Sequence, residues 1–141
     1  MTRVDFYFNA DDKLDVARKL AGKAYQAGLK ALLYTTDERM ASDLDAAIWI
    51  RDKLAFLPHV RCGHPLAKET PVLIGTDADA LASHDVLINL DAAYPPCFGR
   101  FERLLEVVGK DEADRQAGRQ RYAFYKQRGY AIENHDLAKH G

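Results

Sequence analysis

The sequence predicts an α/β fold with a central, mostly parallel sheet, Rossmann-like but without a dinucleotide-binding glycine loop. Two features support this prediction. Short apolar runs alternate with helically periodic segments in the first third of the chain, and the runs at 71–75 and 85–90 are apolar almost throughout, as strands buried on both faces are. At 141 residues the chain fits one domain, residues 1–141, which can bury about two thirds of its unfolded surface.

A first strand and helix are expected between the N-terminus and Gly28. The run VDFYF at 4–8 is β-branched and aromatic, and Asp11 and Asp12 follow it as candidate helix caps. Gly28 is the expected helix stop. Between these signals the apolar residues recur at helical spacing, at Leu14, Ala17, Leu20, Ala21, Ala24 and Tyr25.

A second strand and helix are expected next. The apolar run ALLYTT occupies 31–36, and Asp37 can cap a helix whose apolar positions are Met40, Leu44, Ala47, Ile48 and Trp49. Residues 52–70 are then expected to form a long irregular connection, because Pro58, Gly63 and Pro65 interrupt both periodicities. Connections of this length are often functional.

The last third of the chain is expected to end in a basic helix. Residues 98–108 fit either a helix or a strand, and a helical turn leading into a strand is favoured, which leaves the state of 103–108 open. Asp111 or a neighbour should begin the final helix, and Gly129 should end it.

Composition and charge restrict the class of protein. Twenty Lys and Arg stand against 21 Asp and Glu, for a net charge of −1, which argues against duplex DNA as the main partner. Cys62 and Cys97 form no CxxC pair and are expected to be reduced thiols. The start MTRVDFYF lacks the pattern of a signal peptide and no long apolar run occurs, so we expect a cytoplasmic protein with no membrane contact.

The sequence offers little catalytic chemistry. The turn after the first strand, at 9–12, has no glycine and carries two aspartates, which disfavours a phosphate site, and no P-loop, nucleophile-elbow or zincin motif occurs. His59, Cys62 and His64 resemble a zinc cluster only loosely, since a fourth ligand such as Cys97 or His84 must come from elsewhere. His84 and Asp85 are adjacent and point in different directions in a strand. We therefore expect no metal, no cofactor and no catalytic residue.

A basic stripe with one aromatic residue is the feature most suggestive of binding. Spacings of 4, 3 and 4 place its members on one helical face: Arg115, Arg119, Tyr122 and Lys126. Such a face suits an acidic peptide that also carries apolar side chains. A solvated surface helix is the simpler interpretation, and the residues alone favour it. Phe124 and Tyr125 are expected in the core, with Arg121 and Arg128 on another face.

Two further apolar features lie near the long connection. Trp49 ends the second helix, where a lone Trp is more often part of a core than of an interface. The segment FLPH at 56–59 is interrupted by proline and is predicted to form an exposed docking patch.

From end to end the chain resembles the chi subunits of bacterial DNA polymerase III. The segments that carry the resemblance are FYF near the start, LDAAIW at 44–49, FLPH at 56–59, DVLINL at 85–90, and RFERLLEVV, RQRYAFYKQRGY and HDL from 100, 119 and 135. The resemblance implies a non-catalytic protein with a three-layer α/β/α fold. It also implies two partners, the psi subunit of the clamp loader and the acidic, phenylalanine-ending C-terminal tail of single-stranded-DNA-binding protein, with DNA contacted only indirectly.

The resemblance implies positions for both sites. The tail site would comprise Trp49, Arg115, Arg119, Tyr122 and Lys126, while an alanine at 123 departs from relatives with lysine there. The psi site would comprise Phe56, Leu57, Pro58, His59 and Val60. The competing hypotheses are a small nucleotide-binding protein or enzyme of α/β fold, since open α/β sheets bind ligands beyond their strand C-termini, and a direct nucleic-acid binder.

Overall fold

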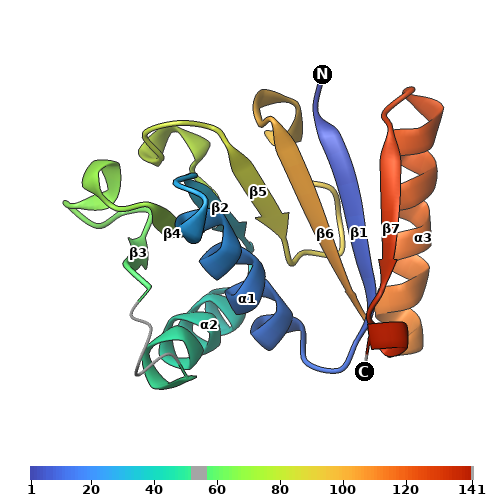
Figure 1. Cartoon of the computed structure of the whole chain (residues 1–141), viewed down its shortest axis with the longest axis horizontal. Helices are drawn as coiled ribbons and strands as arrows, with labels where there is room; N and C mark the ends of the chain where they lie inside the picture. Colours follow the sequence, from blue (N-terminus) through green and yellow to red (C-terminus); the bar gives the residue numbers. More distant parts are fainter. Residues whose placement is uncertain (52–56, 141) are drawn as a thin grey trace.

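A computed structural model describes residues 1–51 and 57–140. Within them the strands form one parallel sheet in the order β3-β4-β2-β5-β6-β1-β7 (Figure 1). The strands are β1 (Arg3–Ala10), β2 (Ala31–Tyr34), β3 (His59–Arg61), β4 (Val72–Gly75), β5 (Val86–Asn89), β6 (Arg103–Gly109) and β7 (Ile132–Asp136). The α-helices are α1 (Lys13–Gln26), α2 (Glu38–Arg51) and α3 (Glu112–Gln127).

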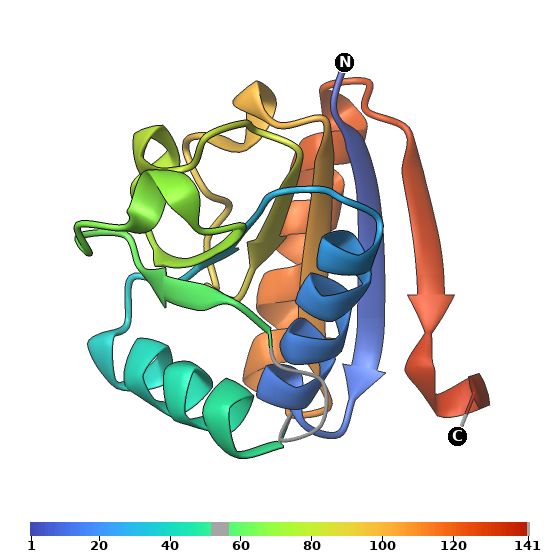
Figure 2. The same ribbon diagram turned by 60° about the vertical axis from the view of Figure 1, so that its left-hand side comes forward.

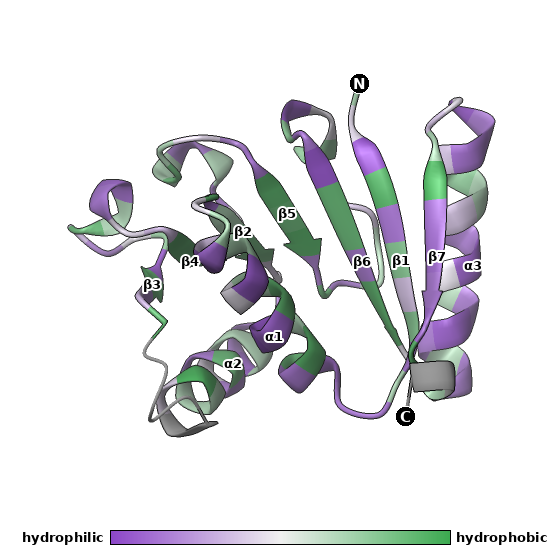
Figure 3. Cartoon of the chain, viewed as in Figure 1, coloured by the Kyte–Doolittle hydropathy of each residue, from purple (hydrophilic) through white to green (hydrophobic). Residues whose placement is uncertain are grey.

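The fold has three layers, as predicted: α1 and α2 lie on one face of the sheet and α3 lies on the other. Side chains alternate between the two faces of each strand, so Leu33 of β2 packs with α1 and α2 while the neighbouring Leu32 packs in the core beneath α3. Figure 2 shows α1 in front of the sheet and α3 behind it. The central strands are fully buried, as β5 illustrates, whereas β7 at the edge is mostly hydrophilic (Figure 3).

Helix limits follow the signals that the sequence contains. The side chains of Asp12 and Asp111 accept hydrogen bonds from backbone amides at the starts of α1 and α3. Asp37 does the same for α2, through the amides of residues 39 and 40. Gly28 and Gly129 follow α1 and α3 with φ of 79° and 85°, a conformation that glycine adopts without strain. These predictions are confirmed.

Other segments show both successes and errors of prediction. Residues 98–100 form a 3-10 turn that leads into β6, as favoured above. The connection at 52–70 is not wholly irregular, because its described part contains the edge strand β3 and a 3-10 turn, Ala67–Glu69. A strand of three residues is too short to show an alternating pattern, so sequence periodicity does not detect it. The edge strand β7 was likewise not anticipated. No helix among the described residues has the length and apolar character needed to cross a membrane.

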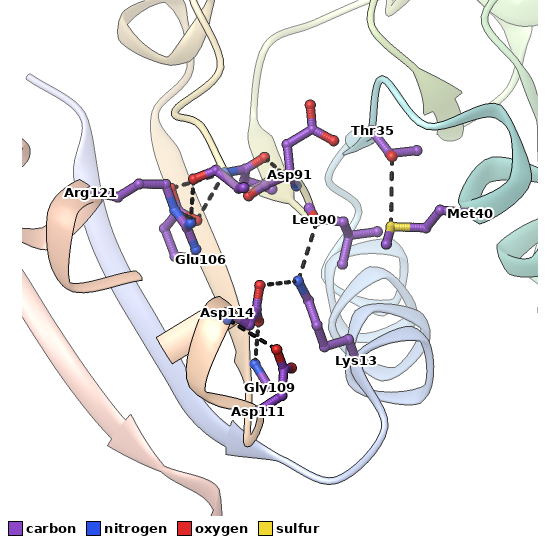
Figure 4. Close-up of polar contacts among 12 residues, drawn as sticks. Lys13, Thr35, Met40, Leu90, Asp91, Glu106, Gly109, Asp111, Asp114 and Arg121 are labelled. Carbon is purple, nitrogen blue, oxygen red and sulfur yellow. Dashed lines mark hydrogen bonds and ion pairs between the residues drawn. The ribbon is translucent and has the colours of Figure 1, made fainter. Parts of the chain in front are cut away.

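A buried network of hydrogen bonds connects α3 to the strands β5 and β6 (Figure 4). The Glu106 carboxylate is fully buried and accepts hydrogen bonds from Arg121 Nε at 2.9 Å, from the Tyr125 hydroxyl at 2.6 Å and from Asn89 Nδ2 at 2.9 Å. Burial raises the pKa of Glu106, and its three partners act in the opposite direction. Tyr125 lies in the core as predicted, whereas the burial of Arg121 was not foreseen.

Candidate functional site

A groove of about 340 Å³ lies between α3 and the strands β1, β6 and β7. Its lining combines an apolar floor with a polar rim. The floor is made by Phe6, Phe8, Val108 and Gly118, and the rim by Asn9, Arg115, Arg119, Tyr122 and Asn134. Phe6 and Phe8 reach the same face of the sheet because they stand two residues apart in β1. The groove therefore offers apolar contact below and hydrogen-bond donors around it.

The depth of the groove depends on a close approach of α3 to β6. A Cβ added at Gly118 would lie 2.9 Å from one Val108 methyl and 3.2 Å from the other. Glycine at this helical position avoids a steric overlap with the Val108 side chain that any larger residue would cause unless that side chain shifts. The ring of Tyr122 then packs edge-on against Phe6, with 5.4 Å between centroids.

The rim of the groove is positively charged. Arg119 Nη1 forms an exposed ion pair with Glu112 Oε1 at 3.4 Å. Such a pair adds little stability and is readily exchanged for another carboxylate. No ion pair of Arg115 is found among the described residues. Lys126 Nζ lies 5.8 Å from the Tyr122 ring centroid, within range of a cation–π contact. Two guanidinium groups are thus available to carboxylates of a ligand.

The structure brings together four of the five predicted tail-site residues and separates the fifth from them. Arg115, Arg119 and Tyr122 line the groove, with Lys126 against Tyr122. Trp49 is 56% exposed and belongs to α2, which packs on the face of the sheet opposite to α3. The expectation that Trp49 and Tyr122 shelter one apolar side chain together is therefore wrong.

Trp49 lies instead beside the segment predicted to contact psi. Its ring centroid is 5.2 Å from that of His59. Pro58 and Val60 are partly exposed, but Leu57 and His59 are buried, so the predicted exposed patch is wrong for those two side chains. Phe56 lies outside the described residues.

His59 has a structural role that explains its burial. Its Nδ1 is 2.7 Å from the Leu57 carbonyl oxygen, and its Nε2 is 2.9 Å from Asp45 Oδ1 on α2. These contacts connect the start of β3 to α2. They also remove His59 from the loose zinc cluster considered above.

Three further candidates for catalysis or zinc binding, Cys62, His84 and Asp85, make other contacts. Cys62 Sγ lies 3.7 Å from the Asp77 carbonyl oxygen, and burial raises the pKa of this thiol. His84 Nε2 is 2.9 Å from the Ala78 carbonyl oxygen, whereas Asp85 accepts a hydrogen bond from the Lys30 amide. His84 and Asp85 therefore do not form a base and its orienting carboxylate.

The carboxyl edge of the sheet, where α/β proteins often bind nucleotides, is held by internal contacts (Figure 4). Lys13 Nζ lies 3.1 Å from Asp114 Oδ1 and 3.3 Å from the Leu90 carbonyl oxygen. The other Asp114 oxygen accepts a hydrogen bond from the Gly109 amide at 2.6 Å. The Asp114 carboxylate thus binds the Lys13 ammonium group and the Gly109 amide, which are the kinds of group that a phosphate would need.

The basic residues at the rim of the groove were predicted from the sequence, but the apolar residues of its floor were not. Alternation within VDFYF is the signal that could have placed Phe6 and Phe8 on one face. Asn9 and Asn134 carry no comparable signal, because their positions depend on the pairing of β1 with β7.

Comparison with known proteins gives a consistent family. The family model for "DNA polymerase III chi subunit, HolC" matches residues 1–133. A DNA polymerase III subunit chi from Pseudomonas aeruginosa is 37% identical over 99% of both chains. One from Haemophilus influenzae is 28% identical over 87% of this chain and 86% of the relative, and one from Escherichia coli is 27% identical over 81% and 78%.

Among solved structures, the fold is similar to a domain of a DEAD-box protein. The C-terminal domain of S. cerevisiae Dbp5, bound to Gle1 and IP6, aligns with a TM-score of 0.69 over 96% of this chain and 90% of that one. The sequence identity is 13%, so this likeness concerns the fold alone.

Proposed function

The chain belongs to the DNA polymerase III chi subunit family, which gives it an accessory role in DNA replication, and we propose that it is a non-catalytic adaptor. In this proposal it connects the clamp loader, through the psi subunit, to single-stranded-DNA-binding protein. The link to the latter is capture of its acidic C-terminal tail.

The observation that carries the proposal is the groove under α3. A tail that ends in phenylalanine needs an apolar floor for its ring and donors for its terminal carboxylate, and the groove combines Phe6 and Phe8 with Arg115 and Arg119. Charge-assisted hydrogen bonds from guanidinium to carboxylate are stronger than neutral ones and favour an acidic ligand over a basic one. Tyr122 and Lys126 extend the same surface along α3.

The tail complex is expected to be weak and sensitive to salt. Arg119 is 60% exposed, so its attraction to a ligand is screened by ions. A short peptide held in this way should bind in the micromolar range, about −8 kcal/mol. Many copies of single-stranded-DNA-binding protein on one strand offset this weakness by avidity.

The psi subunit is proposed to bind a separate surface near β3. Pro58 and Val60 are the partly exposed members of the predicted contact segment, and Trp49 extends the surface from α2. Because α2 and α3 cover opposite faces of the sheet, both partners can bind at once (Figure 2). Simultaneous binding is what an adaptor requires.

Titration calorimetry tests tail capture. The protein is titrated with the C-terminal peptide of single-stranded-DNA-binding protein from its own organism, with and without the final phenylalanine, at low and moderate salt. We expect saturable binding that weakens with salt and is lost without that phenylalanine. Arg119→Ala should weaken binding at least about tenfold, or 1.4 kcal/mol, whereas Arg39→Ala on α2 serves as a charge-matched control. Equal affinity of both variants would refute this placement of the site.

A second pair of measurements tests the separation of the two surfaces. Trp49→Ala should weaken psi binding and leave tail binding unchanged. Loss of tail binding in this variant would show that one surface serves both partners.

A further inference from the structure

We propose that Asp5, Glu133 and His135 form a binding site for a divalent transition-metal ion, with zinc as the ion that suits them best. The site lies on β1 and β7, on the face of the sheet opposite the tail groove. Among the described residues, their ligand atoms form the one group of three or more His, Cys, Asp or Glu side chains close enough to share a metal ion. These atoms all lie within 4.8 Å of one another.

Strand pairing produces this convergence. In the parallel register Asp5 is the partner of Glu133, and Tyr7 is the partner of His135. Residues two apart in a strand share a face, so Glu133 and His135 both point to the side where Asp5 lies. His135 Nε2 is 3.0 Å from Asp5 Oδ1, close to the separation of about 3.3 Å that two ligands on one tetrahedral zinc ion have.

The electrostatics of the cluster favour a cation. Two carboxylates at partner positions repel each other. The charge of Asp5, which is 2% exposed, is compensated by its ion pair with Arg103, whereas this pair leaves the charge of Glu133 without a cation among the described residues. Arg103 Nη2 donates a hydrogen bond to Asp5 Oδ2 at 3.1 Å. This bond orients the carboxylate and leaves Oδ1 directed toward His135. Glu133 is exposed, and no ion pair of its side chain is found in the described ranges. An ion between Asp5 and Glu133 would remove their repulsion.

The surroundings allow an ion to enter and be held. The His135 side chain is 31% exposed, and its ring stacks on Tyr7 with 4.4 Å between centroids, which fixes the plane of the imidazole. Helix α1 packs on this face of the sheet, and Figures 1 and 2 both show it apart from β7. Two carboxylates, one imidazole and a water would complete a four-coordinate zinc site.

Zinc binding should be coupled to the groove. Asn134, between the two β7 ligands, points to the opposite face and lines the tail groove. The ion would thus fix the strand that carries part of the groove rim.

The test is titration of the chelator-stripped, full-length protein with zinc chloride by calorimetry at pH 7.5. We expect one ion per chain, and at least about tenfold weaker binding for Glu133→Gln and for His135→Gln. Cys62→Ser and His64→Gln remove other potential zinc ligands and should change nothing.

Two results would overturn the proposal. One is the absence of saturable binding by the natural sequence at millimolar zinc. The other is equal affinity of the natural protein and Glu133→Gln, which alters an exposed side chain and should fold normally, as circular dichroism can verify. In either case the contact between His135 and Asp5 serves only to attach β7 to β1.

Discussion

Gly118→Ala tests how closely α3 packs on the sheet. The added methyl would lie 2.9 Å and 3.2 Å from the two Val108 methyls, and a β-branched side chain cannot rotate away freely. We estimate a cost of about 1–3 kcal/mol for the overlap. Alanine is better than glycine inside a helix by about 1 kcal/mol, so the net destabilisation should be about 1 kcal/mol.

A double-mutant cycle isolates the overlap from helix propensity. Val108→Ala alone should cost about 2 kcal/mol, because it leaves a small cavity under α3. With Val108→Ala present, the Gly118→Ala methyl has room and fills part of that cavity. Urea unfolding should therefore give a favourable coupling of at least about 1 kcal/mol. Additive free energies of unfolding, with Gly118→Ala stabilising in both backgrounds, would refute this account of the packing.

Three further predictions concern the polar contacts that fix the fold. Arg121→Met should lower the free energy of unfolding by urea by about 3–5 kcal/mol, because it leaves the Glu106 carboxylate buried without its cation. The control is Arg128→Met, and an equal loss of stability in the two variants would contradict this prediction. Burial raises the pKa of Glu106 above 4.5, so the folded state binds the proton more tightly than the unfolded state does. The free energy of unfolding of the natural protein, relative to that of Glu106→Gln, should therefore fall as pH rises above about 4.5. A relative free energy of unfolding that increases with pH would be inconsistent with this. Lys13→Met should cost about 1–2 kcal/mol through loss of its bond to Asp114, and an unchanged unfolding midpoint would argue against that contact.

The sequence predicted most of the fold because its signals are local. Asp12 and Asp111 act within the first turns of their own helices, and Gly28 and Gly129 at the ends. The predicted βα units and the parallel sheet are therefore confirmed. Strand β3 was not predicted because three residues are too few to show an alternating pattern. Strand β7 was not predicted because its residues are only partly buried.

The candidate site was predictable only in part, because a groove depends on contacts distant in sequence. Helical spacing placed Arg115, Arg119 and Tyr122 on one face of α3, and they do line one groove. The position of Trp49 relative to them depends on which face of the sheet each helix covers, and helical spacing carries no such information. The burial of Arg121 could not be predicted for the same reason, because its partner Glu106 belongs to β6 and not to α3.

Mapping of the tail peptide on the protein by amide chemical-shift perturbation tests the central claim most directly. The protein is labelled with nitrogen-15 and titrated with the phenylalanine-ending peptide, and the shifts are compared between the two faces of the sheet. We expect the largest shifts at Phe8, Gly118, Arg119 and Asn134 and no shift at Trp49. Shifts concentrated around Trp49 and Val60, with none along the groove, would contradict it.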